Sequence, residues 1–231
     1  MEIGSLQSPT DHRLNAVGRL LEQTFPDPNT TLGVDRMREF LGQPAGEAGR
    51  EFFILVAEQH GTIIGTTIFS YVPATNCGFS EYLVVRRDFR AQGIGRRLFD
   101  ARLDRLQHGA RRAGHAHPRG LFIEVDSPTR TPPHLLEAER TTAMDAHERL
   151  RIFAHLGFQR VDLAYVQPPL ADGKQPVDYL DLLFRPHTPR ASLPRTWIAD
   201  TLLPIWRAWS PAGSFEVPAS AQEVALRPLD G

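Results

Sequence analysis

A basic turn with two glycines lies between a strand pattern and a helix pattern near the middle of the chain. The stretch from Glu81 to Leu98 reads EYLVVRRDFRAQGIGRRL. Glycines let a backbone approach a ligand closely, and the first turn of a helix presents unpaired N–H groups at the positive end of its dipole. Arg90 and Arg96 add full positive charges at the rim of this turn. We therefore expect an anion-binding site there.

Two common phosphate-binding patterns do not fit this turn. A dinucleotide fingerprint needs a third glycine three residues after Gly95, but Leu98 stands there, and no acidic residue follows on an adjacent strand at the expected distance. A P-loop needs the sequence Gly-Lys-Ser/Thr, which the turn lacks. The remaining alternatives are another phosphate-bearing ligand or a glycine-containing turn with no ligand.

The turn belongs to a longer succession of helix and strand patterns. Apolar residues at spacings of three and four predict helices, and β-branched or aromatic runs bounded by turns predict strands. The expected elements, in chain order, are a helix opening at Ser8-Pro9, a helix over Leu32–Leu41, strands over Phe52–Glu58, Thr62–Val72 and Phe79–Val85, a long helix from Gly93 to about Gly114, a strand over Leu121–Val125, a loop over Ser127–Thr142, a helix from about Ala143 to Leu156, and strands near Phe158–Val166 and Val177–Phe184. The long helix lets the strands on either side of it run parallel through a right-handed crossover. We expect an α/β (α+β) fold with a mixed, mainly antiparallel sheet flanked by helices.

The pattern Arg90-x-x-Gly93-x-Gly95, after a strand that ends in Leu-Val-Val, resembles the pyrophosphate-binding signature of the GNAT superfamily of acyl-coenzyme A dependent acyltransferases. The order of elements is similar to that family throughout residues 1–186. The resemblance implies that the two parallel central strands splay apart and that coenzyme A fills the wedge between them. It implies that the pantetheine arm pairs with the backbone of Leu83, Val84 and Val85. It also implies pyrophosphate contacts from Arg90, Ala91, Gln92, Gly93, Ile94, Gly95 and Arg96.

Transfer of an acyl group from a thioester to an amine requires a base, because an alkylamine has a pKa of about 10.4 and is protonated at neutral pH. The resemblance makes Glu81 the first candidate, since a position nine residues before the signature arginine carries the proposed base in polyamine acetyltransferases of the superfamily. Alternation places Glu81 on one strand face with Leu83 and Val85. The alternative for Glu81 is an exposed strand-end carboxylate or an ion-pair partner.

Two further carboxylates stand on the neighbouring strand. Glu124 and Asp126 share one strand face by the same alternation. If that face opens into the cleft, both join Glu81 in an acidic site that binds a cationic acceptor. The alternative is a strand face that a helix covers.

The expected proton donor for the departing thiolate is missing. Many members of the resembling family carry a tyrosine four residues before a Gly-Phe pair, but this chain has Phe153 there. We expect His155, His147 or Tyr165 to act instead, or water, because a thiolate with a pKa of about 8.5 leaves without much help. A further alternative is a protein that binds acyl-coenzyme A without turning it over.

The composition limits the classes of partner. The 231 residues hold 26 basic and 27 acidic side chains, which argues against nucleic-acid binding by bulk charge. Cys77 is the only cysteine, so we expect no disulfide within the chain and no cysteine metal site. His115 and His117 have no third ligand at a recognisable spacing, so we expect no metal there either. The chain opens without a leader pattern and has no stretch of the ~18 apolar residues that a membrane span needs. We expect a cytoplasmic protein with no membrane partner.

After Pro186 the chain becomes a proline-punctuated tail that carries all three tryptophans. We expect a GNAT acyltransferase domain over residues 1–186 and an appendage over residues 187–231. A helix of this appendage, broken or kinked at Pro204, would dock on its own domain or form a homodimer contact.

The resemblance and the carboxylates together predict an N-acetyltransferase. It would move an acetyl group from acetyl-coenzyme A to a primary amine of a small molecule or a protein. The transfer would be direct, since no activated nucleophile is visible. The alternative function is a noncatalytic acyl-coenzyme A sensor, and the identity of the acceptor stays open.

Overall fold

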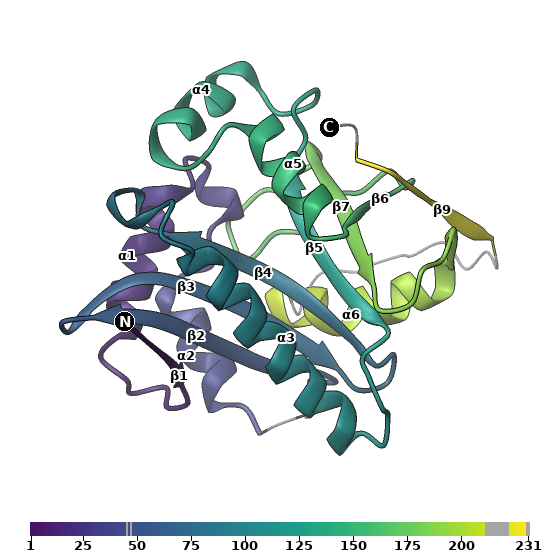
Figure 1. Cartoon of the computed structure of the whole chain (residues 1–231), viewed down its shortest axis with the longest axis horizontal. Helices are drawn as coiled ribbons and strands as arrows, with labels where there is room; N and C mark the ends of the chain where they lie inside the picture. The colour runs from purple at the N-terminus through teal and green to yellow at the C-terminus, as the bar shows by residue number, and fades with distance from the viewer. Residues whose placement is uncertain (45, 47, 211–221, 230–231) are drawn as a thin grey trace.

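The computed structural model describes residues 1–44, 46, 48–210 and 222–229 of the chain. In this part of the chain the strands form one sheet with the order β1-β2-β3-β4-β5-β7-β6-β9-β8 (Figure 1). The strands are β1 (Glu2–Leu6), β2 (Glu51–Gln59), β3 (Thr62–Val72), β4 (Cys77–Val85), β5 (Gly120–Asp126), β6 (Gln159–Val161), β7 (Leu180–Pro186), β8 (Ser192–Pro194) and β9 (Glu223–Arg227). Neighbouring strands are antiparallel except β4 and β5, which are parallel. The mixed, mainly antiparallel sheet that the sequence predicts is confirmed.

The parallel pair at the centre of the sheet separates part of the way along. Residues Cys77–Ser80 of β4 pair with Gly120–Ile123 of β5, and there the pairing stops. Beyond this point β4 continues to Val85 and β5 to Asp126, each paired only with its other neighbour. The two strands therefore splay and open a wedge at their carboxyl ends, as the resemblance implies.

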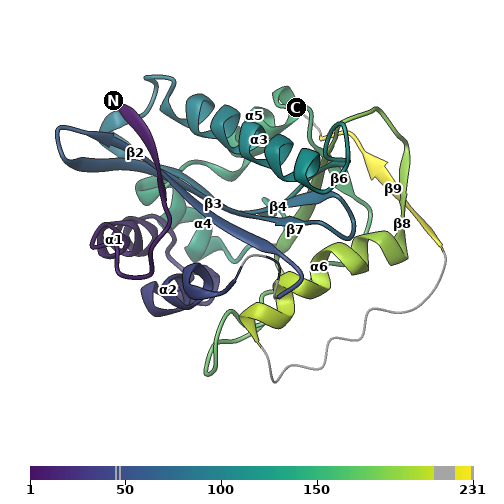
Figure 2. The ribbon, with the colours of Figure 1, turned by 90° about the horizontal axis from the view of Figure 1, so that it is seen from below.

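Helices cover both faces of the sheet. They are α1 (Leu14–Thr24), α2 (Val34–Gly42), α3 (Ile94–Arg112), α4 (Pro133–Thr142), α5 (Ala146–His155) and α6 (Arg195–Trp209), with short 3-10 turns η1 (Pro28–Thr30) and η2 (Arg87–Phe89). Figure 2 shows α3 and α5 above the sheet and α1, α2 and α6 below it. None of the helices in the described residues combines the length and the apolar composition that a membrane crossing requires.

The long helix α3 lies close to β4 because a glycine faces it. A Cβ atom built on Gly78 would come within 2.7 Å of Leu106 Cδ1, so a larger residue there would require the Leu106 side chain to shift. The buried apolar side of α3, which includes Phe99 and Leu106, packs against Tyr71 and Leu121 of the sheet. This packing fixes the N-terminus of α3 at the mouth of the wedge.

Several expected boundaries are wrong. The first helix begins at Leu14 rather than at Ser8-Pro9, because Ser8 closes an isolated turn with Asp11 and the Asp11 carboxylate holds the amide and the guanidinium of Arg13. The expected loop over Ser127–Thr142 contains the helix α4. Its prolines indicate a loop, but proline is favoured in the first turn of a helix, because the N–H donor that it lacks would have no acceptor within the helix there.

The strands after α5 are shorter than their apolar runs suggest. β6 ends at Val161, and the next residue donates its amide to Ala225 of the C-terminal segment. β7 begins at Leu180, and Val177 pairs with Gln167 in an isolated bridge. The strand β1, which pairs along β2 at the edge of the sheet, was not expected from the sequence.

The tail contains more than the expected helix. β9 pairs with β6 through Arg160↔Arg227 and Val161↔Leu226, so residues of the tail extend the main sheet. The helix α6 continues through Pro204, which we expected to break or kink it, and buries Trp197 and Trp209. Residues 211–221 and 230–231 of the expected appendage lie outside the described residues. The boundary at residue 186 stays a prediction.

Candidate active site

A cavity of about 370 Å³ occupies the wedge between β4 and β5. Its walls come from both splayed strands, from the turn before α3, and from α5. It is lined by every residue with a predicted coenzyme contact except Gln92, and by all three candidate carboxylates: Glu81, Leu83, Val84, Val85, Arg90, Ala91, Gly93, Ile94, Gly95, Arg96, Glu124 and Asp126. The cavity thus brings together most of the predicted site, whereas Tyr165 and His155 do not line it.

The turn before α3 has the backbone geometry of an anion cradle. Ala91 and Gly93 adopt left-handed conformations, with φ of 59° and 74°. A Cβ atom on Gly93 would meet nothing within 4 Å, so the space beside this glycine is open. The first amide of α3 with an acceptor among the described residues is that of Arg97, which bonds Gly93 O at 3.1 Å. The preceding amides are left to a ligand, and negative charge suits them because of the helix dipole. The turn therefore fits a pyrophosphate.

The two arginines of the turn have different surroundings. The Arg90 guanidinium donates to Val85 O at 3.1 Å, to Thr142 O at 3.1 Å and to Ala143 O. Its donors are therefore directed at main-chain carbonyls instead of at the open rim. Arg96 is two-thirds exposed and pairs with Asp100 at 2.9 Å. The geometry favours Arg90 as a brace for the turn and leaves Arg96 as the rim charge.

The free edge of β4 offers main-chain groups to an extended ligand. Leu83, Val84 and Val85 pair with β3 on one side but have no β5 partner on the other. The opposite wall is apolar and includes Phe153 of α5, which also contacts Phe158. A long ligand arm with amide groups and methylenes fits both surfaces.

Glu81 lies in a β-bulge, which changes the face it points to. Tyr82 pairs with Ile68 and Ser80 pairs with Phe69, so Glu81 is the extra residue of β4. The expected alternation of Glu81 with Leu83 and Val85 is therefore wrong. The Glu81 carboxylate accepts hydrogen bonds from Ser70 Oγ at 2.9 Å and from Arg50 at 3.0 Å. Glu81 is therefore an ion-pair partner, which is one of the alternatives that the sequence left open.

The charge of Glu81 is partly compensated in the interior. Its side chain and that of Arg50 are almost completely buried, and the Arg50 guanidinium lies 4.3 Å from the ring centre of Phe40. Burial raises the pKa of Glu81 to about 6, while Arg50 and the Ser70 hydroxyl act to lower it. No pattern in the sequence identifies Arg50 as this partner, because it precedes β2 by a single residue and reaches across the sheet.

Glu124 is the half-buried carboxylate of the cavity that lacks a cation. Its two oxygens accept hydrogen bonds from the Tyr165 hydroxyl and from Gln167 Nε2, the latter at 2.8 Å. Among the described residues no basic nitrogen lies within ion-pair distance of it. Burial raises the pKa of Glu124 to about 7, although both hydrogen bonds oppose the shift. The group is therefore poised to exchange a proton near neutral pH.

Tyr165 and Gln167, which do not line the cavity, both donate hydrogen bonds to the Glu124 carboxylate. Burial and the neighbouring Glu124 keep the pKa of Tyr165 well above its usual value, so its hydroxyl stays protonated and donates. Tyr165 was among the candidate residues, but Gln167 was not. Alternation was the available signal, because residues 165 and 167 point to the same side of an extended segment.

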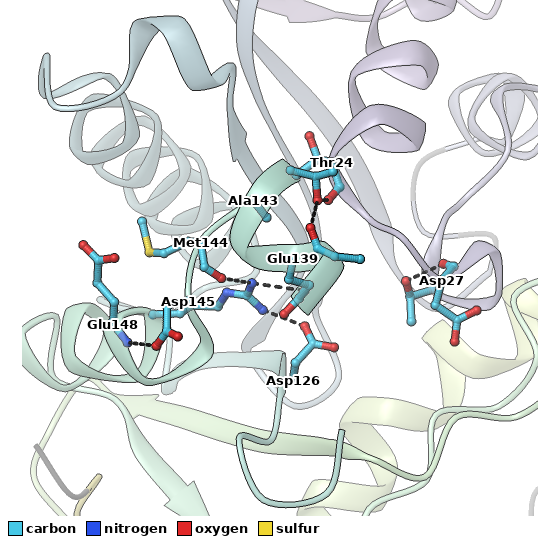
Figure 3. A network of polar contacts seen from close by, with 12 residues as sticks. Thr24, Asp27, Asp126, Glu139, Ala143, Met144, Asp145 and Glu148 are labelled. Atoms are coloured by element: carbon cyan, nitrogen blue, oxygen red, sulfur yellow. Dashed lines mark hydrogen bonds and ion pairs between the residues drawn. The ribbon is translucent and has the colours of Figure 1, made fainter. Parts of the chain in front are cut away.

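Asp126 shares an arginine with a carboxylate of α4. Arg149 bonds Asp126 Oδ2 at 2.6 Å and Glu139 Oε1 at 3.1 Å, and it also donates to Met144 O (Figure 3). Burial is the main cause that raises the pKa of Glu139, with Arg149 acting against it. Glu139 and Arg149 were not among the candidate residues. The sequence predicted a loop where α4 lies, so it gave no reason to place Glu139 next to Asp126.

The predicted histidine donors lie away from the cavity. His155 is at the exposed end of α5, where its Nδ1 atom lies 2.7 Å from Arg151 O. His147 is also exposed, near the Asp145 that caps α5. Their roles stay predictions. Tyr82 does line the cavity, but its hydroxyl donates to Thr30 O and accepts from the Leu32 amide.

Comparison with known proteins relates this arrangement to one family. Residues 14–118 match the model of the acetyltransferase (GNAT) family, whose members use acetyl-coenzyme A. No curated protein sequence matches the chain significantly. The matched region includes the turn before α3 and the free edge of β4.

Solved structures of acetyltransferases share the fold. A protein from Bacteroides thetaiotaomicron that is described as a GNAT-family acetyltransferase has a TM-score of 0.55 and 17% identity, covering 82% of this chain and 89% of its own. The ribosomal-protein-S18-alanine N-acetyltransferase from Escherichia coli has a TM-score of 0.51 and 17% identity, covering 82% and 95%. An aminoglycoside 6'-N-acetyltransferase complexed with coenzyme A has a TM-score of 0.51 and 15% identity, covering 82% and 99%. At these identities the likeness is one of fold.

Proposed function

From the premise that this chain carries a GNAT acetyltransferase domain, we propose that it moves an acetyl group from acetyl-coenzyme A directly to a primary amine. The observation that carries the proposal is the position of Glu124. This half-buried carboxylate without a cation lines the same cavity as the anion cradle. A proton acceptor and an acyl-donor site in one cavity are what aminolysis of a thioester requires.

The chain's own residues fit the donor in two places. The amides of Gly93 through Arg96 suit its pyrophosphate, and the free edge of β4 from Leu83 to Val85 suits the amides of its pantetheine arm. When bound, the donor supplies an activated thioester. Arg90 holds the turn in place through the carbonyls of Val85, Thr142 and Ala143.

Glu124 is the proposed general base. A carboxylate with a pKa of about 7 removes a proton from an ammonium group more readily than one of ordinary pKa, directly or through one water. Glu81 is the weaker candidate, because Arg50 already compensates its charge. Tyr165 orients the Glu124 carboxylate and acts through it.

The α5 residues that line the cavity, Arg149, Ile152 and Phe153, carry no hydroxyl group for the departing thiolate. Phe153 lines the cavity where a hydroxyl would be needed, and it has no proton to give. Once Glu124 has taken the proton of the amine, it becomes an acid with a pKa of about 7 that can give this proton to the thiolate in the same cavity. We propose that Glu124 or water returns the proton to sulfur, whose pKa of about 8.5 makes it a tolerable leaving group.

Thiol release from acetyl-coenzyme A in the presence of a panel of primary amines tests this function. The Glu124→Gln variant should lower kcat by about 100-fold or more, while the affinity for coenzyme A in calorimetry stays unchanged. Glu22→Gln, which alters an exposed carboxylate of α1, serves as the matched control. Full turnover by Glu124→Gln would contradict the assigned base.

The second candidate function is a noncatalytic acyl-coenzyme A sensor, which Phe153 favours. It predicts binding of acetyl-coenzyme A in calorimetry with no amine-dependent release of thiol. A small-molecule amine, a protein amine, a homodimer and a cytoplasmic location remain predictions from the sequence.

A further inference from the structure

A second cavity, of about 170 Å³, lies at the edge of the sheet where β1 stops. β1 pairs with β2 only as far as Leu6↔Ile54, so residues Glu51–Phe53 of β2 have no strand partner on that side in the described part of the chain. The cavity is lined from both faces of the sheet, by Phe40 of α2 below it and by Arg105 of α3 above it (Figure 2). It has no lining residue in common with the cavity in the wedge.

Arg50 is the buried cation of this second cavity. A guanidinium group carries five N–H groups. Nη1 of Arg50 donates to Ser70 Oγ at 2.9 Å and to Glu81 Oε1 at 3.0 Å. Nε and Nη2 are buried and have no acceptor among the described residues, and the side chain is only 1% exposed. These two nitrogens form the side of the guanidinium that can hold a carboxylate through two parallel hydrogen bonds, so an anion would satisfy them.

Arg105 adds a second positive charge to the cavity. Its Nε atom is also buried without an acceptor among the described residues. Arg50 is paired with Glu81, and Glu51, which also lines the cavity, is paired with Arg112. In the described part of the chain Arg105 is therefore the cation of this cavity without an ion-pair partner. The excess of one positive charge suits a monoanion.

Aromatic rings lie beside both arginines. The guanidinium carbon of Arg50 lies 4.3 Å from the ring centre of Phe40 and 5.1 Å from that of Phe52, and the guanidinium carbon of Arg105 lies 4.9 Å from that of Phe53. All three rings line the cavity. A cavity of ~150 Å³ holds one benzene molecule, so this one has room for a ligand of about the size of a single ring.

We propose that this second cavity binds a small carboxylate with an apolar body. The carboxylate oxygens would accept hydrogen bonds from Nε and Nη2 of Arg50 and from Arg105, and the apolar body would lie against the three phenylalanine rings. The ligand would be a third molecule, distinct from the acyl donor and from the amine. The ion pair between Arg50 and Glu81 connects its site with the cavity in the wedge, which Glu81 lines.

Calorimetry with benzoate and with benzamide at millimolar concentration tests the site. The two molecules have nearly the same shape, but only benzoate carries a charge, so benzoate should bind about tenfold more tightly. The titrations are repeated in saturating coenzyme A, which competes for the anion cradle before α3. The benzoate affinity should stay unchanged there, because the two cavities have separate walls. Absence of benzoate binding, an affinity no higher than that for benzamide, or loss of binding in coenzyme A would each overturn the site.

Two variants identify the arginines. Arg105→Gln removes the cation without an ion-pair partner and should weaken benzoate binding about tenfold. Arg111→Gln removes the charge of an exposed arginine on the same helix and should keep the native affinity. Glu81→Gln keeps an acceptor for Arg50 but removes the charge that compensates it, so benzoate should bind about tenfold more tightly than to the native chain. Native affinity in Arg105→Gln, or no gain in Glu81→Gln, would contradict the assigned contacts.

Discussion

The donor turn and the acceptor wall line one cavity but present their polar groups differently. The donor turn, residues 90–96, offers main-chain amides that a left-handed glycine and a helix start direct outward. The acceptor wall, formed by Glu81, Glu124 and Asp126, offers side-chain carboxylates whose charge depends on partners from other elements. Local backbone geometry therefore determines how the donor turn binds an anion. How the acceptor wall binds a cation depends instead on which of its carboxylates have partners that compensate their charge.

Removal of the cation from Glu81 should have the largest effect on stability. Arg50→Met leaves Glu81 buried without its ion-pair partner, and the free energy of unfolding should fall by about 3–5 kcal/mol at pH 8. The loss should be smaller at pH 5, where Glu81, with a pKa of about 6, takes up a proton instead. Urea unfolding at both pH values measures this effect, and an equal loss at the two would show that Arg50 contributes packing alone.

The titration of Glu124 should give the next largest effect. Its pKa is raised by burial from about 4.5 unfolded to about 7 folded, so the folded state binds more protons between these values. Stability from this group is complete below pH 4.5 and is lost as the pH rises toward 7, by on the order of 3 kcal/mol.

Stability curves of Glu124→Gln test this sign. The variant should lack that pH-dependent loss, so its stability relative to the native chain should increase between pH 5 and 8. Activity should change with pH in the opposite direction to stability, because a base acts when it is deprotonated. In the native chain kcat/KM should therefore rise through pH 7. A stability difference that does not change with pH would remove the argument for a poised carboxylate.

A change in the donor turn should have the smallest effect on stability and should be confined to donor binding. Gly93→Ala adds a Cβ atom to the open cradle at a φ of 74° and should weaken coenzyme A binding about tenfold, or about 1.4 kcal/mol. Calorimetry with coenzyme A measures this, and Gly61→Ala, at a φ of 73° in the β2–β3 turn, controls for backbone strain. Similar losses of affinity in both variants would show that strain, and not the cradle, is responsible.

The same contrast explains which parts of the site the sequence predicts. The turn and the splayed strands follow from a contiguous pattern of glycines, arginines and apolar runs, because their geometry is local. The bulge at Glu81 shifts a strand face by one residue and leaves no local pattern. Arg50, Glu139 and Arg149 reach the wall from distant elements, so only the folded chain shows which carboxylate they neutralise.

The fold after α5 shows the same limit. Apolar runs located β6 and β7, but their ends depend on pairing with β9 and on the bridge between Gln167 and Val177. The prolines at the start of helix α4 indicate a loop in the sequence, although a proline at the first helical position loses no hydrogen bond.

Arg90 connects the end of β4, which belongs to the donor side of the cavity, with the end of α4. The carbonyls it gathers belong to the last residue of β4 and to the last residue of α4 and its successor. Arg87 adds a second link, because its guanidinium donates to Thr141 O of α4 at 2.9 Å. A ligand that displaced the turn would therefore pull on the end of α4 through these two arginines.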